Sequence, residues 1–218
     1  MFELVKPHQP IQVHSISTGV YSALKNGILD GTLAPGERLI VTDIAGRYQI
    51  SQAPVREALE RLKQEGLIVG QPNKGSIVSY ITSKEIKDLF VLREMIEAFA
   101  VRTSMSMLTE EDYGELAVAL EAMEAAVKER DNLKILEQDM AFHGFFYRKC
   151  GNEAILELWN QMKTKIMRFM AVSNRHYSTD NLVAWHRRLI EALKTGDAAF
   201  AEREFVEHMH AYKMIPME

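Results

Sequence analysis

The sequence predicts a mainly α-helical chain with an N-terminal winged helix-turn-helix and a C-terminal all-α helical bundle. Two observations support this fold class. Two short helical patterns flank a tight turn at Gln49-Ile50, and a hairpin pattern follows them at residues 67–80. From Thr82 onward, apolar residues recur at helical spacing in long segments, and no strand pattern returns. With 218 residues, the chain is long enough for two such domains.

The composition is typical of a soluble globular protein, with 47% hydrophobic and 26% charged residues. No apolar run approaches the roughly 18 residues that a membrane span needs, and the first residues lack a signal-peptide pattern. We therefore expect a cytoplasmic protein with no membrane partner. Cys150 is the only cysteine, so an intrachain disulfide and a zinc finger are both excluded.

The formal net charge of −4 is unevenly distributed. Residues 18–75 hold seven Lys and Arg against six Asp and Glu, a net of +1, whereas residues 76–218 hold 18 against 23, a net of −5. The predicted helix-turn-helix is thus weakly basic in an acidic chain. Binding to DNA would rely on a few placed cations and helix N-termini rather than on a broad positive field.

The first two helices are predicted from apolar spacing and from residues that end or cap helices. A first helix begins near Ser17 and ends before Gly31. Residues 33–39 are expected to form a turn, and Thr42 is expected to cap a short second helix that ends at Tyr48.

The third helix is the one that a DNA major groove would admit. Ser51 is expected to cap it, and Pro54 fits its first turn. Apolar residues at i, i+4 and i+7 form its buried stripe, which leaves Gln52, Ala53 and Arg56 on the outer side of the first turns. A short helix with a polar leading end, after another short helix and a turn, is the arrangement of a groove-reading helix.

Residues 50–59 read Ile-Ser-Gln-Ala-Pro-Val-Arg-Glu-Ala-Leu. This run resembles the recognition segment of the GntR family of bacterial transcription regulators, which usually reads close to Val-Ser-Arg-Thr-Pro-Val-Arg-Glu-Ala-Leu. The resemblance implies binding to a double-stranded DNA operator. The candidate DNA-contacting residues are Thr42, Arg47, Ser51, Gln52, Ala53, Arg56, Lys74 and Gly75.

Two of these positions depart from the usual family sequence. Gln52 and Thr42 stand where the family commonly has Arg. Since Arg pairs with guanine and Gln with adenine, we expect an altered base preference at the position that Gln52 reads. Arg56 is the main candidate cation, although its spacing also fits a surface ion pair with Glu60. Lys74 lies in the wing, by analogy along the DNA backbone or minor groove.

The second domain is predicted to be a bundle of roughly six or seven helices. Thr82 with Glu85, and Thr109 with Asp112, form capping boxes at the start of its first two helices. Further helices are expected at residues 132–149, 154–172, 182–194 and 198–212. The chain thus divides into a flexible arm at residues 1–15, a winged helix-turn-helix at residues 16–80 and an all-helical domain at residues 81–218.

Asp139 and His143 project from one face of a predicted helix because they are four residues apart. That face is otherwise apolar, and a buried carboxylate is costly unless it is paired or binds a metal. His186 and His208 lie on the apolar faces of two later helices, whereas His210 projects with charged residues and is left out. Each histidine alone is more often an ordinary core or surface residue.

Taken together, these residues resemble the ligand-binding domain of FadR-type GntR regulators, called the FCD domain. In that family, an Asp-x-x-x-His pair and two later histidines about 22 residues apart bind one divalent metal. Asp139 and His143 match the pair, and His186 and His208 are 22 residues apart. The resemblance implies a divalent metal ion, with zinc first and nickel, manganese or iron as alternatives that ligand identity alone does not separate. It also implies that the helical domain forms a homodimer.

Arg93 lies on the buried stripe of the first bundle helix. It could bind the carboxylate of a small organic acid held at the metal. An internal ion pair with Glu97 or another acidic residue is an equally good interpretation.

The leading functional hypothesis is a transcription regulator, not an enzyme, whose affinity for a palindromic operator responds to a small carboxylate effector. One alternative is a metal sensor in which the ion itself is the signal. A second is a purely structural ion, and a third is a metal-dependent hydrolase, because a metal with open positions can activate water.

Overall fold

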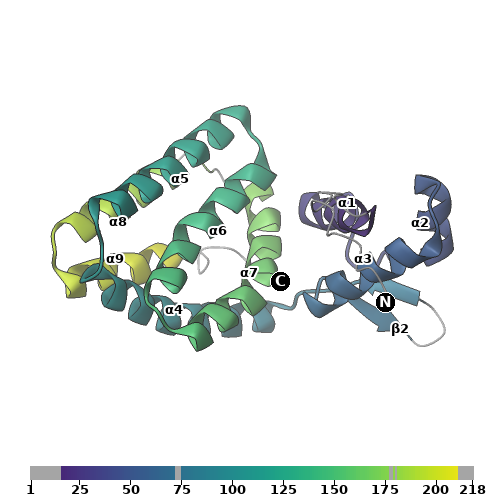
Figure 1. The fold of residues 1–218 in the computed structure, drawn as a ribbon, viewed down its shortest axis with the longest axis horizontal. Helices are drawn as coiled ribbons and strands as arrows, with labels where there is room; N and C mark the ends of the chain where they lie inside the picture. The colour runs from purple at the N-terminus through teal and green to yellow at the C-terminus, as the bar shows by residue number, and fades with distance from the viewer. Residues whose placement is uncertain (1–15, 72–74, 177–178, 180, 211–218) are drawn as a thin grey trace, which may run out of the picture.

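The computed structural model describes residues 16–71, 75–176, 179 and 181–210, and Figure 1 shows two groups of elements. We call the part from α1 to β3 the head and the part from α4 to α9 the bundle. Each part has its own cluster of buried apolar side chains. The mainly α-helical fold class is confirmed. None of the helices in these ranges is long and apolar enough to cross a membrane.

The head consists of three helices and a small antiparallel sheet in the order β1-β3-β2. Its core forms where α1 and α3 pack together, and the side chains of Val55 and Leu62 are completely buried there. Leu39 pairs with Ser76 across the sheet. The elements are α1 (Ile16–Asp30), β1 (Arg38–Leu39), α2 (Val41–Tyr48), α3 (Gln52–Gln64), β2 (Ile68–Gln71) and β3 (Gly75–Val78).

Three details of the head differ from the sequence prediction. Ile40, in an extended conformation, is the N-cap of α2, so Thr42 lies inside the helix and does not cap it. Ser51 occupies the N-cap position of α3 as predicted, but its side chain makes no capping hydrogen bond. Residues 38–39, expected in a turn, form a strand because β3 supplies their hydrogen-bond partners.

The bundle begins with two helices whose starts were predicted correctly. Thr82 and Glu85 form a capping box at the start of α4, and Thr109 and Asp112 form one at the start of α5. The described residues contain six bundle helices, within the predicted range. They are α4 (Ser83–Met105), α5 (Glu110–Glu129), α6 (Asn132–Lys149), α7 (Glu153–His176), α8 (Leu182–Lys194) and α9 (Ala198–Met209).

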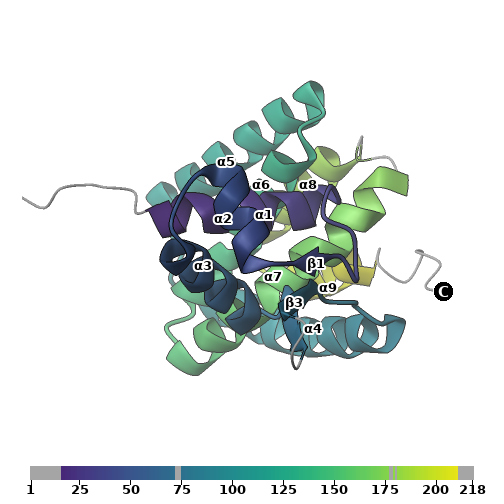
Figure 2. The same ribbon diagram turned by 90° about the vertical axis from the view of Figure 1, so that its right-hand side faces the viewer.

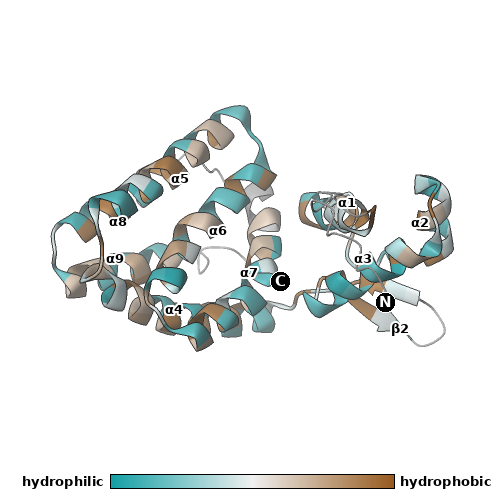
Figure 3. Cartoon of the chain, viewed as in Figure 1, coloured by the Kyte–Doolittle hydropathy of each residue, from teal (hydrophilic) through white to brown (hydrophobic). Residues whose placement is uncertain are grey.

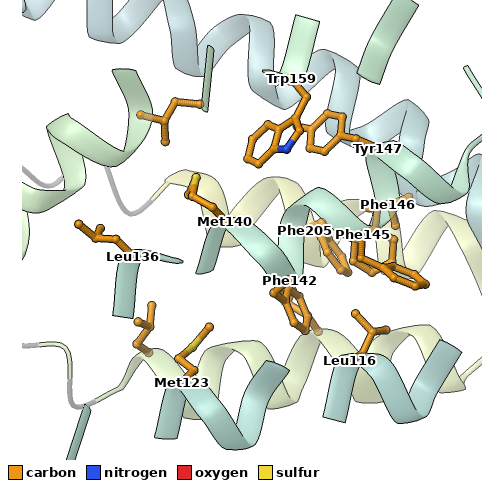
Figure 4. Close-up of a cluster of buried hydrophobic side chains, with 14 of the residues drawn as sticks. Leu116, Met123, Leu136, Met140, Phe142, Phe145, Phe146, Tyr147, Trp159 and Phe205 are labelled. Atoms are coloured by element: carbon orange, nitrogen blue, oxygen red, sulfur yellow. The ribbon is translucent and has the colours of Figure 1, made fainter. Parts of the chain in front are cut away.

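Helix α6 lies at the centre of the bundle and packs against α4, α5 and α7, while α9 packs against α4 and α8. Polar and apolar stretches alternate along these helices (Figure 3), which is the pattern of helices with one buried face. Aromatic side chains fill the core around α6 (Figure 4). Phe142, Phe146 and Phe205 are all completely buried there.

The head meets the bundle along α7, which forms the edge of the bundle facing α1 (Figure 1). Viewed from the head, α1 runs across the face of the bundle (Figure 2). Glu65, which follows α3, accepts hydrogen bonds from Lys25 of α1 at 2.8 Å and from Thr164 of α7 at 3.2 Å. Arg168 of α7 donates to the Oγ atom of Ser79 at 2.6 Å and also to its carbonyl oxygen. Polar contacts therefore connect α7 to both ends of the hairpin in the head.

Candidate metal centre and DNA-contact surface

Helix α6 brings Asp139 and His143 into the middle of the bundle core. Most residues in its second half are buried, from Phe142 to Tyr147 without a break. Asp139 is 1% exposed and His143 is fully buried. A carboxylate in such a place needs a hydrogen-bond partner, a counter-ion or a metal.

The two later histidines reach the same point from α8 and α9. One ligand atom from each of Asp139, His143, His186 and His208 lies within 4.8 Å of the other three. The Nε2 atom of His186 is 3.1 Å from Oδ1 of Asp139, and the Nε2 atom of His143 is 3.9 Å from it. The ring centroids of His186 and His208 are 4.6 Å apart. The structure thus brings all four predicted ligands together.

Among the described residues, four buried atoms of this cluster have no hydrogen-bond partner: both carboxylate oxygens of Asp139 and the Nε2 atoms of His143 and His186. The Nε2 atom of His186 lies 3.1 Å from Oδ1 of Asp139, but this contact gives neither atom a hydrogen bond. Unpaired buried polar atoms are uncommon, and each one needs an explanation. A divalent cation among the four would bind all of them, so the donor set fits a metal.

The other ring nitrogens determine which tautomers these histidines adopt. Nδ1 of His186 is 2.9 Å from the carbonyl oxygen of Leu182, which can only accept a hydrogen bond. Nδ1 of His143 contacts a carboxylate oxygen of Glu97. Both Nδ1 atoms therefore carry the proton, which leaves each Nε2 with a free lone pair directed at the cluster.

Electrostatics keep the cluster in the form that binds metals. Burial lowers the pKa of His143, although Glu97 opposes this, and burial together with the two neighbouring histidines lowers the pKa of His208 far below its ordinary value. Burial would raise the pKa of Asp139, but the pKa falls below its usual range, and the permanent charge of Arg93 contributes to this. Neutral imidazoles and an ionised carboxylate are the protonation states that a metal requires.

Arg93 has the ion pair that the sequence offered as an alternative. Its Nε atom donates to Oε2 of Glu97 at 2.9 Å, and both side chains are buried. Its Nη2 atom is also buried, and no described residue hydrogen-bonds to it. The guanidinium lies 5.7 Å from the ring of Trp159 and 5.8 Å from that of Phe90. Arg93 is thus only partly satisfied.

Sequence reasoning treated Glu97 only as a partner of Arg93 and did not identify Tyr147. Tyr147 donates to Oε2 of Glu97 at 2.9 Å and stacks on Trp159 of α7 with ring centroids 4.4 Å apart (Figure 4). Helical spacing places Glu97 near Arg93 and Tyr147 near His143, but it gives no signal that Glu97 contacts His143. His210 pairs with Glu94 at 3.1 Å, outside the cluster, as its sequence position predicted.

In the head, the predicted contact residues on α3 are on its surface. Gln52, Ala53 and Arg56 are exposed, together with Ser51 before them. Arg56 donates to the side chain of Gln52 at 2.8 Å, so in this structure its partner is Gln52, whereas spacing had suggested Glu60.

The remaining DNA candidates lie on α2 and in the wing. Thr42 and Arg47 are exposed on α2. Gly75 begins β3 with φ +80, a conformation that glycine adopts without strain. Lys74 lies outside the described residues.

The chain matches two family models, "Bacterial regulatory proteins, gntR family" over residues 16–78 and "FCD domain" over residues 88–211. The HTH-type transcriptional repressor RspR of Escherichia coli (strain K12) is 26% identical over 206 residues, which cover 94% of this chain and 88% of that protein. The gluconate operon transcriptional repressor of Bacillus licheniformis is 29% identical over 189 residues, covering 83% of this chain and 77% of that protein. The solved structure of E. coli McbR/YncC, at 25% identity, gives a TM-score of 0.72 and covers 92% of this chain and 96% of that one. The chain therefore belongs to the gntR family of bacterial regulatory proteins and carries an FCD domain.

Proposed function

We propose that this protein is a cytoplasmic transcription regulator whose head binds a double-stranded DNA operator. In this proposal, a small organic acid bound at or near a divalent metal in the bundle controls operator affinity. The main support is the set of buried potential metal-ligand atoms of Asp139, His143 and His186, which lie around one point and have no hydrogen-bond partner in the part of the chain that the structure describes. The names of the relatives RspR and the gluconate operon repressor favour repression.

Zinc is the first candidate for the ion, with nickel, manganese and iron as alternatives. Three imidazoles and one carboxylate suit any of these ions. When bound, the ion would supply a Lewis acid for an oxygen ligand of the effector. The protein's part is to keep the imidazoles of His143 and His208 neutral and Asp139 ionised, as the pKa directions of these three groups favour.

Arg93 is proposed to bind the carboxylate of the acid. A guanidinium offers several N–H donors in one plane, and Glu97 occupies only the Nε donor. The buried Nη2 atom is left for a second carboxylate. Arg93 is separated from the cluster by a single side chain, because Glu97 pairs with Arg93 and also contacts His143. Gluconate, after which one relative is named, is a carboxylate of this chemical class.

Helix α7 supplies a physical connection between the proposed site and the head. Trp159 of α7 stacks on Tyr147, which donates to Glu97 beside the cluster. Further along α7, Thr164 and Arg168 hydrogen-bond to the head. A ligand that displaces α7 would therefore change how the head is held, provided that it favours one position of the helix over the other.

A homodimer is proposed because a palindromic operator requires two heads. Helix α4 offers a surface for the second copy. Val91, Met95 and Phe99 recur every four residues along it and are 53%, 68% and 38% exposed. A stripe of exposed apolar residues on one helix is suited to an isologous contact with the same stripe of another copy.

The hydrolase alternative is disfavoured by the position of the nearest additional carboxylate. Glu97 contacts His143 through one oxygen and accepts hydrogen bonds from Arg93 and Tyr147 through the other. A general base must be able to reach the water that it deprotonates. Glu97 faces away from the lone pair of His143 that would bind the ion, so it is poorly placed for that role.

Operator binding by zinc-loaded and EDTA-treated protein tests the proposal. Fluorescence anisotropy would be measured on the promoter next to the protein's own gene, with simple hydroxy acids added one at a time. We expect an acid to change affinity only in the zinc-loaded protein, and Arg93→Lys to lose that response while Arg102→Lys, an exposed position on the same helix, keeps it.

The other readings predict different results in the same assay. If zinc alone switches DNA binding and acids have no effect, the ion is the signal. If EDTA lowers only the melting temperature and the acid response persists, the ion is structural. Hydrolysis of simple esters, amides or phosphates that His143→Ala abolishes would favour the enzyme. Any of these outcomes would overturn the proposed effector mechanism.

The base that Gln52 reads can be tested separately by selecting bound sequences from a random pool. We expect adenine to be enriched at one position of each half-site and guanine to replace it for Gln52→Arg. Recovery of the same half-site by both proteins would contradict the proposed contact. Gln64→Arg, the same substitution at an exposed position on the same helix, controls for the added positive charge.

A further inference from the structure

Glu97 lies outside the four-residue cluster but contacts one of its members directly. Its side chain on α4 is completely buried. One oxygen contacts Nδ1 of His143, and the other accepts hydrogen bonds from Nε of Arg93 and the hydroxyl of Tyr147, both at 2.9 Å. Both oxygens are therefore occupied, and three neighbours fix the orientation of the carboxylate.

This arrangement fixes the orientation of His143. Because the carboxylate pairs with the always charged guanidinium of Arg93, it can only accept, and Nδ1 of His143 must donate. The opposite nitrogen, Nε2, then points its lone pair at Asp139, 3.9 Å away. Metal-binding histidines commonly donate their second N–H to a carboxylate or carbonyl, which orients the ring and makes it a stronger ligand.

The two buried histidines are oriented by different kinds of acceptor. His186 donates to a neutral carbonyl oxygen of its own helix, that of Leu182. His143 donates to a carboxylate that comes from another helix, α4. A hydrogen bond to an ionised group is shorter and stronger than one between neutral groups. His143 should therefore be the more electron-rich of the two donors.

We propose that Glu97 is a positioning residue for the metal centre, which holds His143 in its metal-binding tautomer and strengthens it as a ligand. This inference rests on the proposed metal site. Glu97 does not bind the ion, because His143 lies between them. Arg93 and Tyr147 are needed to hold Glu97, so they support the metal indirectly.

The test measures metal affinity and coordination in the full-length protein. Zinc affinity is obtained by competition with a chromophoric chelator, and the visible absorption of bound Co²⁺ reports ligand geometry. For Glu97→Gln, we expect zinc affinity to fall by about 10- to 100-fold, the usual effect of losing an outer-shell partner. The Co²⁺ bands should shift as well. Glu94→Gln, the same change three residues earlier on α4, should match the wild type in both measurements.

The outcomes separate this inference from the metal site itself. If Glu97→Gln binds zinc as tightly as the wild type with unchanged Co²⁺ bands, the role of Glu97 is wrong and the site stands. If neither the wild type nor Glu97→Gln binds zinc or Co²⁺, the site itself is wrong, and the inference with it.

A second variant covers the case in which Glu97→Gln does not fold because the charge of Arg93 is left buried. Arg93→Leu/Glu97→Leu removes the pair together, a change that buried ion pairs often tolerate. It also removes the acceptor of His143. The same loss of zinc affinity is expected, and wild-type affinity would overturn the inference.

Discussion

Removing the metal should destabilise the bundle, and the structure allows the effect to be estimated. Four buried atoms of Asp139, His143 and His186 have no hydrogen-bond partner within the described ranges. An unpaired buried polar group costs about 1–3 kcal/mol, so the carboxylate and the two imidazoles together cost about 3–9 kcal/mol, comparable with the roughly 5–15 kcal/mol by which domains are stable. The metal-free protein should therefore be markedly less stable than the loaded one.

The size of the thermal shift follows from binding linkage. Zinc at about 1,000 times its dissociation constant stabilises the folded state by about 4 kcal/mol. One kcal/mol shifts the melting temperature by roughly 2–4 °C in a protein of this size. Differential scanning calorimetry should thus show a melting temperature about 8–16 °C higher in excess zinc than in EDTA.

Two neighbouring histidines on α9 provide the matched pair of variants. His208 belongs to the cluster, whereas His210 pairs with Glu94 outside it. His208→Ala should lose most of the zinc-dependent shift, and His210→Ala should retain it. Equal melting temperatures of the wild type in zinc and in EDTA would refute the reasoning, as would equal zinc responses of the two variants.

Three further predictions concern DNA binding, pH and the head–bundle contact. Arg56→Ala should weaken operator binding by about 1–3 kcal/mol, measured by anisotropy, and Lys87→Ala on the bundle should not. The pKa values of His143 and His208 are lowered from 6.5 in the folded protein, so the unfolded chain binds more protons below about pH 6.5. The melting temperature of the EDTA-treated protein should therefore fall as the pH drops. A melting temperature that stays constant between pH 7 and 5 would contradict this. Arg168→Ala removes charged hydrogen bonds to the segment after β3, each worth about 1.5–3 kcal/mol. In calorimetry, the unfolding of the head should then separate from that of the bundle. A single unchanged transition would show that this contact does not couple them.

Local patterns in the sequence predicted most of the fold. The two capping boxes at Thr82 and Thr109 are local, because their partners lie three residues away, and the structure has both. The short strand at residues 38–39 could not be predicted in this way. Its partner is β3, almost 40 residues later, and two residues carry no periodic pattern of their own.

In the candidate metal site, too, local spacing was predictable from the sequence and contacts between distant segments were not. Asp139 and His143 share one turn of α6, so spacing alone placed them together, and the resemblance to a family supplied His186 and His208. The role of Glu97 could not be read in this way, because its contact with His143 joins α4 to α6 across 46 positions of the chain. For the same reason, the sequence left two interpretations of Arg93 open, as an effector-binding residue and as an ion-pair partner of Glu97. Only packing decides which of its nitrogens meets Glu97 and which is left over.

The stacking of Trp159 on Tyr147 gives this protein a built-in optical reporter. The chain has only two tryptophans. Trp159 is buried behind the proposed site, and Trp185 is 45% exposed, with its ring centroid 6.4 Å from that of His208. Indole fluorescence is sensitive to its surroundings. The binding of a metal or an acid at this centre should therefore change the tryptophan fluorescence of unlabelled protein, in real time and without DNA.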